Sequence, residues 1–386
     1  MPKTIATTPS WYWPEGTPRV LGIPPYSLEE MLVQPWIQAR PHEALLVSGD
    51  TRLSGPELAQ AVHAASARVA AEIPPDSSGT LYAGPDLDGV VLVLGALASG
   101  RQVHLKALDA AEAARIGETL PAASIGEPIA SRGTHPGTAT YEPAVCLDGR
   151  FGRAWHSQRS LLAWAISIRG FLPRASTEPE TWLSTFSPCT WEGMTALGAA
   201  LIDGGTLVLA APGEASREAA TTEHPAWLFT SFEDAATTFA GSGRRRRSEG
   251  VPLRSALLSV DGPFDPAARG ALTSSLGNAL TVYGTAETGP MLASHPSWYL
   301  DESVGIPVTN MHVVPGDPET AERITTMWEL IDHAMITAWS PSLMLGYEGP
   351  TGASHLEGHR FLTGMLAASD PNGMLYLLGD EDVPGR

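Results

Sequence analysis

The chain has 386 residues, of which 43% are hydrophobic and 17% charged, and its formal net charge is −18. This length exceeds what one hydrophobic core usually holds, so we expect two packed subdomains, and the composition excludes a disordered chain. A surface this acidic repels phosphate backbones and anionic lipids, which argues against nucleic-acid and membrane partners.

Two cysteines, Cys146 and Cys189, are too few for a disulfide framework and favour a reducing compartment. The first residues of the chain contain no apolar core of the kind that signal peptides carry. The most apolar stretch, residues 90–98, is too short to cross a bilayer. These features predict a soluble cytoplasmic protein.

Residues 1–43 are rich in proline and aromatic side chains and show little periodicity, so we expect an extended arm lying over a core. A helix is predicted from Ser54, a suitable N-cap residue, with Pro56 in its first turn. A further helix is predicted over residues 90–98 and ends at Gly100. Short apolar runs predict strands at 44–47, 80–82, 102–105, 144–147, 181–186, 206–210, 227–230, 256–260 and 280–283.

Strands and helices alternate through residues 44–290, a pattern that predicts parallel sheets covered by helices. The helical patterns thin out after about residue 290, and strand-like runs follow at 312–314, 334–339 and 374–378. The expected domain order is therefore an arm, an α/β core of two subdomains, and a smaller β-rich subdomain over residues 291–386.

One short run, Tyr283-Gly284-Thr285-Ala286-Glu287, resembles the motif Tyr-Gly-x-Thr-Glu. Other stretches match motifs of the same set in the same order, at 53–58, 93–100, 191–192, 201–209, 341–347 and 361–365. Together they resemble the adenylate-forming (AMP-binding) superfamily, which includes acyl-CoA ligases and the adenylation domains of peptide synthetases. The resemblance implies an α/β fold like the family's large N-terminal domain, with two parallel-type sheets layered with helices plus a smaller β-rich subdomain.

The resemblance implies a nucleotide site, with ATP or AMP and Mg²⁺ as the cofactors that it would hold. In the family, an aromatic at the position of Tyr283 stacks on adenine, and the acid at the position of Glu287 binds Mg²⁺. Without the resemblance, Tyr283 is an ordinary strand-end aromatic and Glu287 is an acid favoured at a helix start. The implied nucleotide contacts are Gly262, Tyr283, Gly284, Thr285, Glu287 and Thr363, and the implied substrate-pocket residues are Ser187 and Trp191.

The sequence departs from the family where the phosphate loop belongs, at residues 144–153, because the hydroxyl-rich run is missing. Asp148 places an acid where phosphates would lie, and Arg153 replaces the family lysine only if the register slips by one. Asp148 and Gly149 form a common turn pair, so these residues favour a plain hairpin.

Three single positions depart as well. Met365 stands where the family aspartate accepts the ribose hydroxyls, and a thioether is a weak acceptor. Asp380 stands where the family has an arginine, which inverts the charge. Ser187 stands where amino-acid-activating relatives have an aspartate, so an α-amino acid held in the usual way is not expected. The chain ends at Arg386, near the family's hinge, and the small C-terminal catalytic domain is expected to be absent.

These residues favour a degenerate homologue that binds a carrier protein, a partner enzyme or a carboxylic acid ligand without completing acyl activation. The alternative is an active ATP-dependent ligase that forms acyl-adenylates, with a rebuilt phosphate site or a separate C-terminal domain. A third interpretation is an enzyme of other chemistry that reuses the acyl pocket. The run Arg244-Arg245-Arg246-Arg247 is interpreted as a solvated loop, with contact to CoA phosphates or an acidic carrier protein left open.

Overall fold

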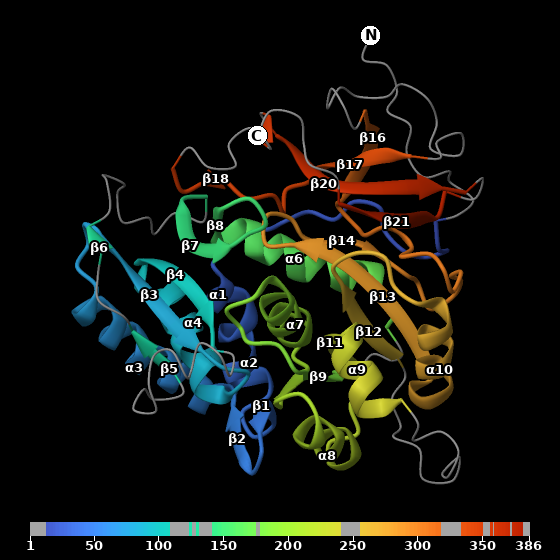
Figure 1. The fold of residues 1–386 in the computed structure, drawn as a ribbon. Helices are drawn as coiled ribbons and strands as arrows, with labels where there is room; N and C mark the ends of the chain where they lie inside the picture. The colour runs from blue at the N-terminus through green and yellow to red at the C-terminus, as the bar shows by residue number, and fades with distance from the viewer. Residues whose placement is uncertain are drawn as a thin grey trace.

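The structure is a computed structural model, and it describes residues 13–108, 123–125, 129–130, 141–174, 178–240, 255–317, 333–349, 356–357, 359–370 and 373–380. In this part of the chain the strands form three sheets. Figure 1 shows two of them on either side of the central helix α7 (Trp191–Leu201) and the third lying across the top. Within the described ranges, no helix is both long and apolar enough to cross a membrane.

The first sheet, called here the N-terminal sheet, has the order β18-β8-β7-β4-β3-β5, with β6 beside β3. The strands β3, β4 and β7 pair in parallel, and antiparallel strands extend the sheet at both ends. The strand bounds are β3 Ser77–Ala83, β4 Gln102–Ala107, β5 Ala123–Ile125, β6 Ile129–Ala130, β7 Pro143–Asp148, β8 Arg153–Ser157 and β18 Gly346–Tyr347.

The helices α3 (Gly55–Glu72) and α4 (Leu87–Ser99) pack together beside the N-terminal sheet, and α4 contacts β3. A capping box of Ser54 and Glu57 begins α3. The Asp86 side chain caps α4, which ends at Gly100 with a left-handed φ of 67°. Local sequence signals therefore set the bounds of both helices.

The second sheet has the order β15-β14-β13-β12-β11-β9-β10-β1-β2. Its six central strands pair in parallel, and antiparallel strands lie at each edge. The strand bounds are β1 Ala44–Ser48, β2 Thr51–Ser54, β9 Thr181–Ser184, β10 Thr206–Leu209, β11 Trp227–Ser231, β12 Ser255–Val260, β13 Asn278–Thr285, β14 Gly289–Ala293 and β15 Ile306–Pro307.

Both faces of this second sheet are covered. The helices α8 (Glu214–Thr222), α9 (Phe232–Phe239) and α10 (Pro266–Leu276) contact its strands, and α7 contacts β9, β10 and β14. Adjacent residues on one strand, Phe229 and Leu228, belong to different buried clusters on the two faces. Burial on both faces explains why these strands read as continuous apolar runs.

The third sheet is antiparallel, with the order β16-β17-β20-β19 and β21 beside β20. Its strands are β16 His312–Gly316, β17 Ala334–Trp339, β19 Leu356–Glu357, β20 Arg360–Ser369 and β21 Leu375–Asp380. Beneath it in Figure 1 runs α6 (Gln158–Phe171), which packs on α7. Near the start of the chain, α1 (Leu28–Leu32) and α2 (Gln34–Ala39) are short helices.

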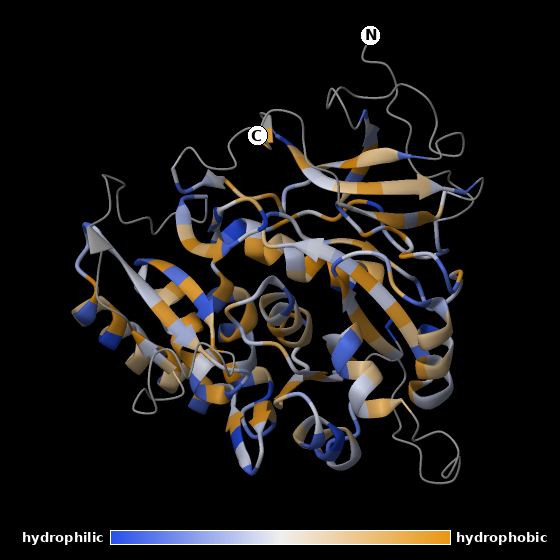
Figure 2. Cartoon of the chain, in the orientation of Figure 1, coloured by the Kyte–Doolittle hydropathy of each residue, from blue (hydrophilic) through white to orange (hydrophobic). Residues whose placement is uncertain are grey.

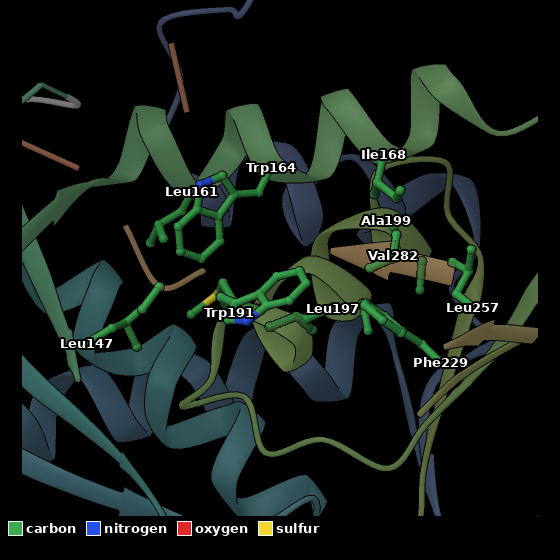
Figure 3. Close-up of a cluster of buried hydrophobic side chains, with 14 of the residues drawn as sticks. Leu147, Leu161, Trp164, Ile168, Trp191, Leu197, Ala199, Phe229, Leu257 and Val282 are labelled. Atoms are coloured by element: carbon green, nitrogen blue, oxygen red, sulfur yellow. The ribbon is translucent and has the colours of Figure 1, made fainter. Parts of the chain in front are cut away.

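The largest buried cluster lies where the sheets meet around α6 and α7. Figure 3 shows Leu161, Trp164 and Ile168 on the side of α6 that faces α7, spaced as one helical face requires. Trp191 lies opposite them at the start of α7. Figure 2 shows hydrophilic residues along the outer helices α3 and α8. Polar residues therefore lie on the outside of the molecule, and the apolar cluster lies where the sheets meet.

The predicted α/β fold with a β-rich region is confirmed. The second sheet is mainly parallel, whereas the N-terminal sheet is parallel only in its three central strands. The extended arm expected over residues 1–43 is wrong in part, because α1 and α2 form within it. The edge strand β2, the strands β8 and β14, each one strand in from an edge, and the long strand β20 were not predicted. Past residue 290, β14 and β15 still belong to the second sheet, and β18 joins the N-terminal sheet.

Candidate functional site

The residues expected from the Tyr-Gly-x-Thr-Glu resemblance lie together on one hairpin. The strand β13 carries Tyr283, Gly284 and Thr285, and Glu287 follows in the turn before β14. The backbone N–H of Thr285 donates to the hydroxyl of Thr288 at 3.2 Å, which closes the turn. This expected group is therefore one local structural unit.

The side chains of this hairpin are enclosed. Tyr283 is 1% exposed, Thr285 8% and Glu287 0%. Gly284 lies against the backbone of Gly289, and a Cβ added there would lie 3.0 Å from Cη2 of Trp191. The Tyr283 ring has no open face for a base to stack on, and the Glu287 carboxylate has no contact with solvent.

Glu287 takes its hydrogen bonds from the protein itself. Its Oε1 atom accepts from the backbone N–H of Phe151 at 3.3 Å and from the hydroxyl of Tyr347 at 3.1 Å. The Oε2 atom has no hydrogen-bond partner among the described residues. Burial and the adjacent Glu287 carboxylate raise the pKa of the Tyr347 hydroxyl, so the hydroxyl stays protonated and donates.

The hairpin predicted at Asp148 and Gly149 is confirmed, and its turn covers Glu287. The strands β7 and β8 pair antiparallel up to Asp148 opposite Arg153, and Gly149 N–H donates to the carbonyl of Gly152 at 2.9 Å. A Cβ added at Gly149 would lie 2.5 Å from Oε1 of Glu287. The turn thus approaches the carboxylate so closely that only glycine fits.

A second hydrogen bond fixes the same hairpin to the same turn. Nε2 of His156, at the end of β8, lies 2.7 Å from the carbonyl oxygen of Ala286. A carbonyl only accepts, so Nε2 carries the proton, and Nδ1 faces the Ser160 hydroxyl at 3.3 Å. Burial lowers the pKa of His156 to about 4, so the ring is neutral at pH 7.

Cations near the expected phosphate position pair with carboxylates. Nε of Arg153 lies 2.9 Å from a carboxylate oxygen of Glu348, and Nζ of Lys106 lies 3.3 Å from Oδ2 of Asp148. Arg153 was the candidate replacement for the family lysine. In this structure the Arg153 guanidinium forms an ion pair with Glu348.

The expected ribose region is filled by Met365. The Thr363 hydroxyl donates to the Ile336 carbonyl at 2.8 Å and accepts the backbone N–H of Met365 at 3.0 Å. Met365 is 0% exposed, and a Cβ added at Gly262 would lie 4.0 Å from its Cε atom. On the next strand, Asp380 pairs with Met365 in the β20–β21 register. The thioether therefore lies beside Gly262, where the resemblance implied a nucleotide.

Of the two expected substrate-pocket residues, Ser187 bonds to backbone groups and Trp191 begins α7. The Ser187 hydroxyl donates to the carbonyl of Ala83 at 2.6 Å and accepts the N–H of Cys189 at 3.1 Å, so it stabilises the turn before α7. Trp191 begins α7, and its ring packs edge-on to Phe229 with centroids 6.3 Å apart. Ser187 is thus occupied by backbone groups.

A cavity of about 370 Å³ opens beside Trp191, between the ends of β4 and β7 and the start of α7. Lys106 and Asp148 line it on one side and Glu192 on the other. Oε1 of Glu192 accepts from the Ser259 hydroxyl at 3.2 Å, and burial raises the pKa of the carboxyl to about 7. The cavity therefore holds a cation and an acid that changes charge near neutral pH.

Sequence reasoning missed four residues of this region: Lys106, His156, Glu192 and Tyr347. Glu192 and Tyr347 stood inside matched motifs, so their positions were visible, but no role was assigned to them. Lys106 follows an expected strand and gave no signal of its own. The hydrogen bond of His156 to Ala286 joins residues 130 positions apart, which no local pattern reveals.

The fit of a Mg²⁺–nucleotide complex depends on Glu287, because hard oxygen ligands must reach the ion. This carboxylate is fully buried under the turn of the β7–β8 hairpin. In the portion of the chain that the structure describes, no group of three or more His, Cys, Asp or Glu residues is placed to hold a metal ion. One of the Glu287 oxygens, Oε2, has no hydrogen-bond partner among the described residues, and the turn at Gly149 lies against the other, Oε1.

No family model matches the chain, and no curated protein matches it. Solved structures do match. The luciferase-like enzyme from the mealworm Zophobas morio aligns with a TM-score of 0.73 at 15% identity, covering 94% of this chain and 98% of that one. A benzoate CoA ligase from Burkholderia xenovorans aligns with a TM-score of 0.74 at 15% identity. The alignment covers 92% of this chain and 80% of that one.

A nonribosomal peptide synthetase bound to α-methyl-L-serine-AMP aligns with a TM-score of 0.73 at 20% identity. The alignment covers 97% of this chain and 47% of that one. Similarity at these identities establishes the fold. The chain has the fold of the large domain of adenylate-forming enzymes, as the sequence motifs implied. Within that class, its structural neighbours include CoA ligases and peptide synthetases.

Proposed function

We propose that this protein uses the adenylate-forming scaffold to bind a small carboxylic acid without activating it with ATP. The observation that carries the proposal is the enclosure of Glu287 by the Phe151 N–H and the Tyr347 hydroxyl. An ATP-dependent ligase needs that carboxylate for its metal ion. Met365 beside Gly262 supports the proposal, because a thioether is only a weak acceptor for the ribose hydroxyls that the resemblance implies there.

The cavity beside Trp191 is the proposed binding site. Its volume of about 370 Å³ lies within the usual range for small-molecule pockets. The Trp191 ring supplies an apolar wall, and the Lys106 ammonium, paired with Asp148 at 3.3 Å, supplies a cation at the rim. The carboxylate of a bound acid would replace the Asp148 side chain as the partner of Lys106, so the Lys106 ammonium would stay paired.

ATP–pyrophosphate exchange over a panel of carboxylic acids tests the absence of activation, with an active benzoate CoA ligase as the positive control. Calorimetric titration with ATP·Mg²⁺ accompanies it. We expect no exchange above the enzyme-free blank and no measurable ATP binding. Clear exchange with one acid contradicts the proposal and favours an active ligase with a rebuilt phosphate site.

Calorimetric titration of the same acids without ATP tests the binding site. Trp191→Ala is expected to weaken the best acid at least about tenfold, because it removes the apolar wall. Trp298→Ala is the matched control, since Trp298 is 42% exposed and does not line the cavity. Equal affinities of the two variants would exclude this cavity as the site.

A further inference from the structure

A larger cavity of about 650 Å³ lies elsewhere in the molecule, between the N-terminal segment 13–23, the start of α6 and the third sheet. It shares no lining residue with the cavity beside Trp191. Its wall is mainly apolar, with Leu21 and Ile23 from the segment and Met311 and Val313 from the sheet side. Trp13 and Trp339 add two aromatic surfaces. Its size suits a small organic molecule.

Hydrogen bonds hold the segment that forms one wall. Oδ1 of Asn310 accepts the backbone N–H of Leu21 at 2.7 Å, and the Asn310 N–H donates to the carbonyl of Arg19 at 2.9 Å. Thr309 donates its hydroxyl to the carbonyl of Pro18 at 2.7 Å. Asn310 has a left-handed φ of 65°, which asparagine tolerates better than most residues. The wall is therefore preformed, so a ligand would not have to order it.

The charge of this cavity is opposite to that of the chain. The chain carries 42 acidic and 24 basic residues, yet none of the described residues that line the cavity is acidic. Arg19, Arg159, His312 and His359 line it. Such a concentration of basic groups on an acidic protein attracts an anion locally.

Arg159 is the basic residue best placed to fix an anion. Its Nη1 donates to the carbonyl of Ile23 at 2.9 Å and to the hydroxyl of Tyr141 at 3.1 Å, and its guanidinium lies 4.9 Å from the Tyr141 ring centroid. Both acceptors are neutral, and no described carboxylate forms an ion pair with Arg159. Among the described residues the guanidinium is thus held in place by neutral groups alone, and its planar group suits a carboxylate.

We propose that this cavity is a ligand site for an organic anion with an aromatic or branched hydrocarbon body, whose carboxylate pairs with Arg159. The apolar wall and the two tryptophans hold the body. Arg159 selects the negative charge, and Arg19 lines the same cavity. The site does not depend on the function proposed for the cavity beside Trp191.

Calorimetric titration with 2-naphthoate tests the site, and the neutral 2-naphthamide of similar size is the matched probe. We expect 2-naphthoate to bind at least about tenfold more tightly than 2-naphthamide, because a charge-assisted bond is lost with the amide. Arg159→Gln should remove this preference, and Arg159→Lys should keep most of it. Arg68→Gln, at an exposed arginine paired with Glu72, is the control and should bind like wild type.

Gly22→Phe is an independent test, because Gly22 lines the cavity and a Cβ there has no atom within 4 Å. The added ring should fill the cavity and abolish 2-naphthoate binding while thermal unfolding stays unchanged. Neither Arg159 nor Gly22 lines the cavity beside Trp191, so loss of 2-naphthoate binding by both variants separates the two sites. Equal binding of the two probes, or undiminished binding by Arg159→Gln and Gly22→Phe, would overturn the assignment.

Discussion

The backbone N–H of Phe151 lies 3.3 Å from Oε1 of Glu287 and donates a hydrogen bond to it. The two residues are 136 positions apart, and the bond joins the turn of the β7–β8 hairpin to the turn between β13 and β14. In the sequence motifs these are the positions of a phosphate loop and a metal ligand. In this protein the Phe151 N–H donates directly to the Glu287 carboxylate, so the two turns contact each other without a nucleotide between them.

The close approach at Gly149 predicts a stability effect. Gly149→Ala places a Cβ 2.5 Å from Oε1 of Glu287 and 2.8 Å from the Gly152 carbonyl oxygen, so the turn must shift. We expect a loss of about 1–3 kcal/mol in the free energy of unfolding. Gly270→Ala is the control, because α10 has open space there and alanine should stabilise by about 0.5–1 kcal/mol. Urea unfolding measures both, and a neutral Gly149→Ala would mean that the turn does not press on Glu287.

The buried carboxylate predicts different effects for two substitutions of Glu287. Glu287→Gln keeps an oxygen that accepts from Phe151 and Tyr347 and removes a buried charge, so the free energy of unfolding should stay within about 1 kcal/mol of wild type. Glu287→Ala loses both bonds and leaves a void, which should cost about 2–4 kcal/mol. Thermal and urea unfolding distinguish the cases. If the glutamine variant is as unstable as the alanine variant, the charge itself is required, as a bound cation would demand.

Restoring the family residue at position 365 should not restore nucleotide binding. Met365 is 0% exposed, so Met365→Asp buries a carboxylate, and we expect a loss of about 3 kcal/mol or more in stability. Met365→Leu conserves volume and should cost less than about 1.5 kcal/mol. Calorimetric titration of both variants with AMP and with ATP·Mg²⁺ is expected to show no binding. Tight ATP binding by Met365→Asp would show that the β7–β8 turn opens readily.

Glu192 predicts a pH dependence of stability. Its pKa is about 7 in the folded protein, raised chiefly by burial from an ordinary value of 4.5. Between these values the folded state binds the extra proton, so stability falls as pH rises from 4.5 to 7. Glu192→Gln should therefore be more stable than wild type by about 1–3 kcal/mol at pH 8, and the difference should disappear near pH 4.5.

Urea unfolding of wild type and Glu192→Gln at pH 4.5, 6 and 8 measures this difference. Glu218→Gln on the exposed side of α8 is the control and should follow wild type at every pH. A constant difference between Glu192→Gln and wild type across this range would show that Glu192 is already ionised at low pH.

Most of the fold was readable from local signals. The helix α3 was predicted from Ser54 and Pro56, and α4 from its apolar run and Gly100. The central strands were predicted because burial on both faces makes them apolar throughout. The antiparallel strands β8 and β14 were missed because β8 is short and polar and β14 contains Gly289 and Pro290. Pairing partners distant in the chain, not local composition, make them strands.

The sequence predicted which residues belong to the site, but it did not predict how those residues are arranged in space. The motif predicted that Tyr283 and Glu287 belong to one site, and the structure places both on one hairpin. The missing hydroxyl-rich run and the turn pair Asp148-Gly149 indicated a plain hairpin in place of a phosphate loop. Neither signal reveals that the turn would cover the glutamate, since that contact depends on how two sheets pack. The arginine run Arg244–Arg247 lies outside the described residues, so its predicted role stays a prediction.

The small strand β18 has a consequence for the order of folding. It adds residues 346 and 347 to a sheet built mainly from the first 157 residues, with backbone bonds from Leu345 to Trp155 and from Glu348 to Arg153. The Tyr347 hydroxyl that covers Glu287 arrives with this strand. A ribosome must therefore reach residue 347 before the enclosure of Glu287 is complete. Contacts of such long sequence separation form late, so nascent chains that stop short of β18 lack the Tyr347 hydrogen bond to this carboxylate.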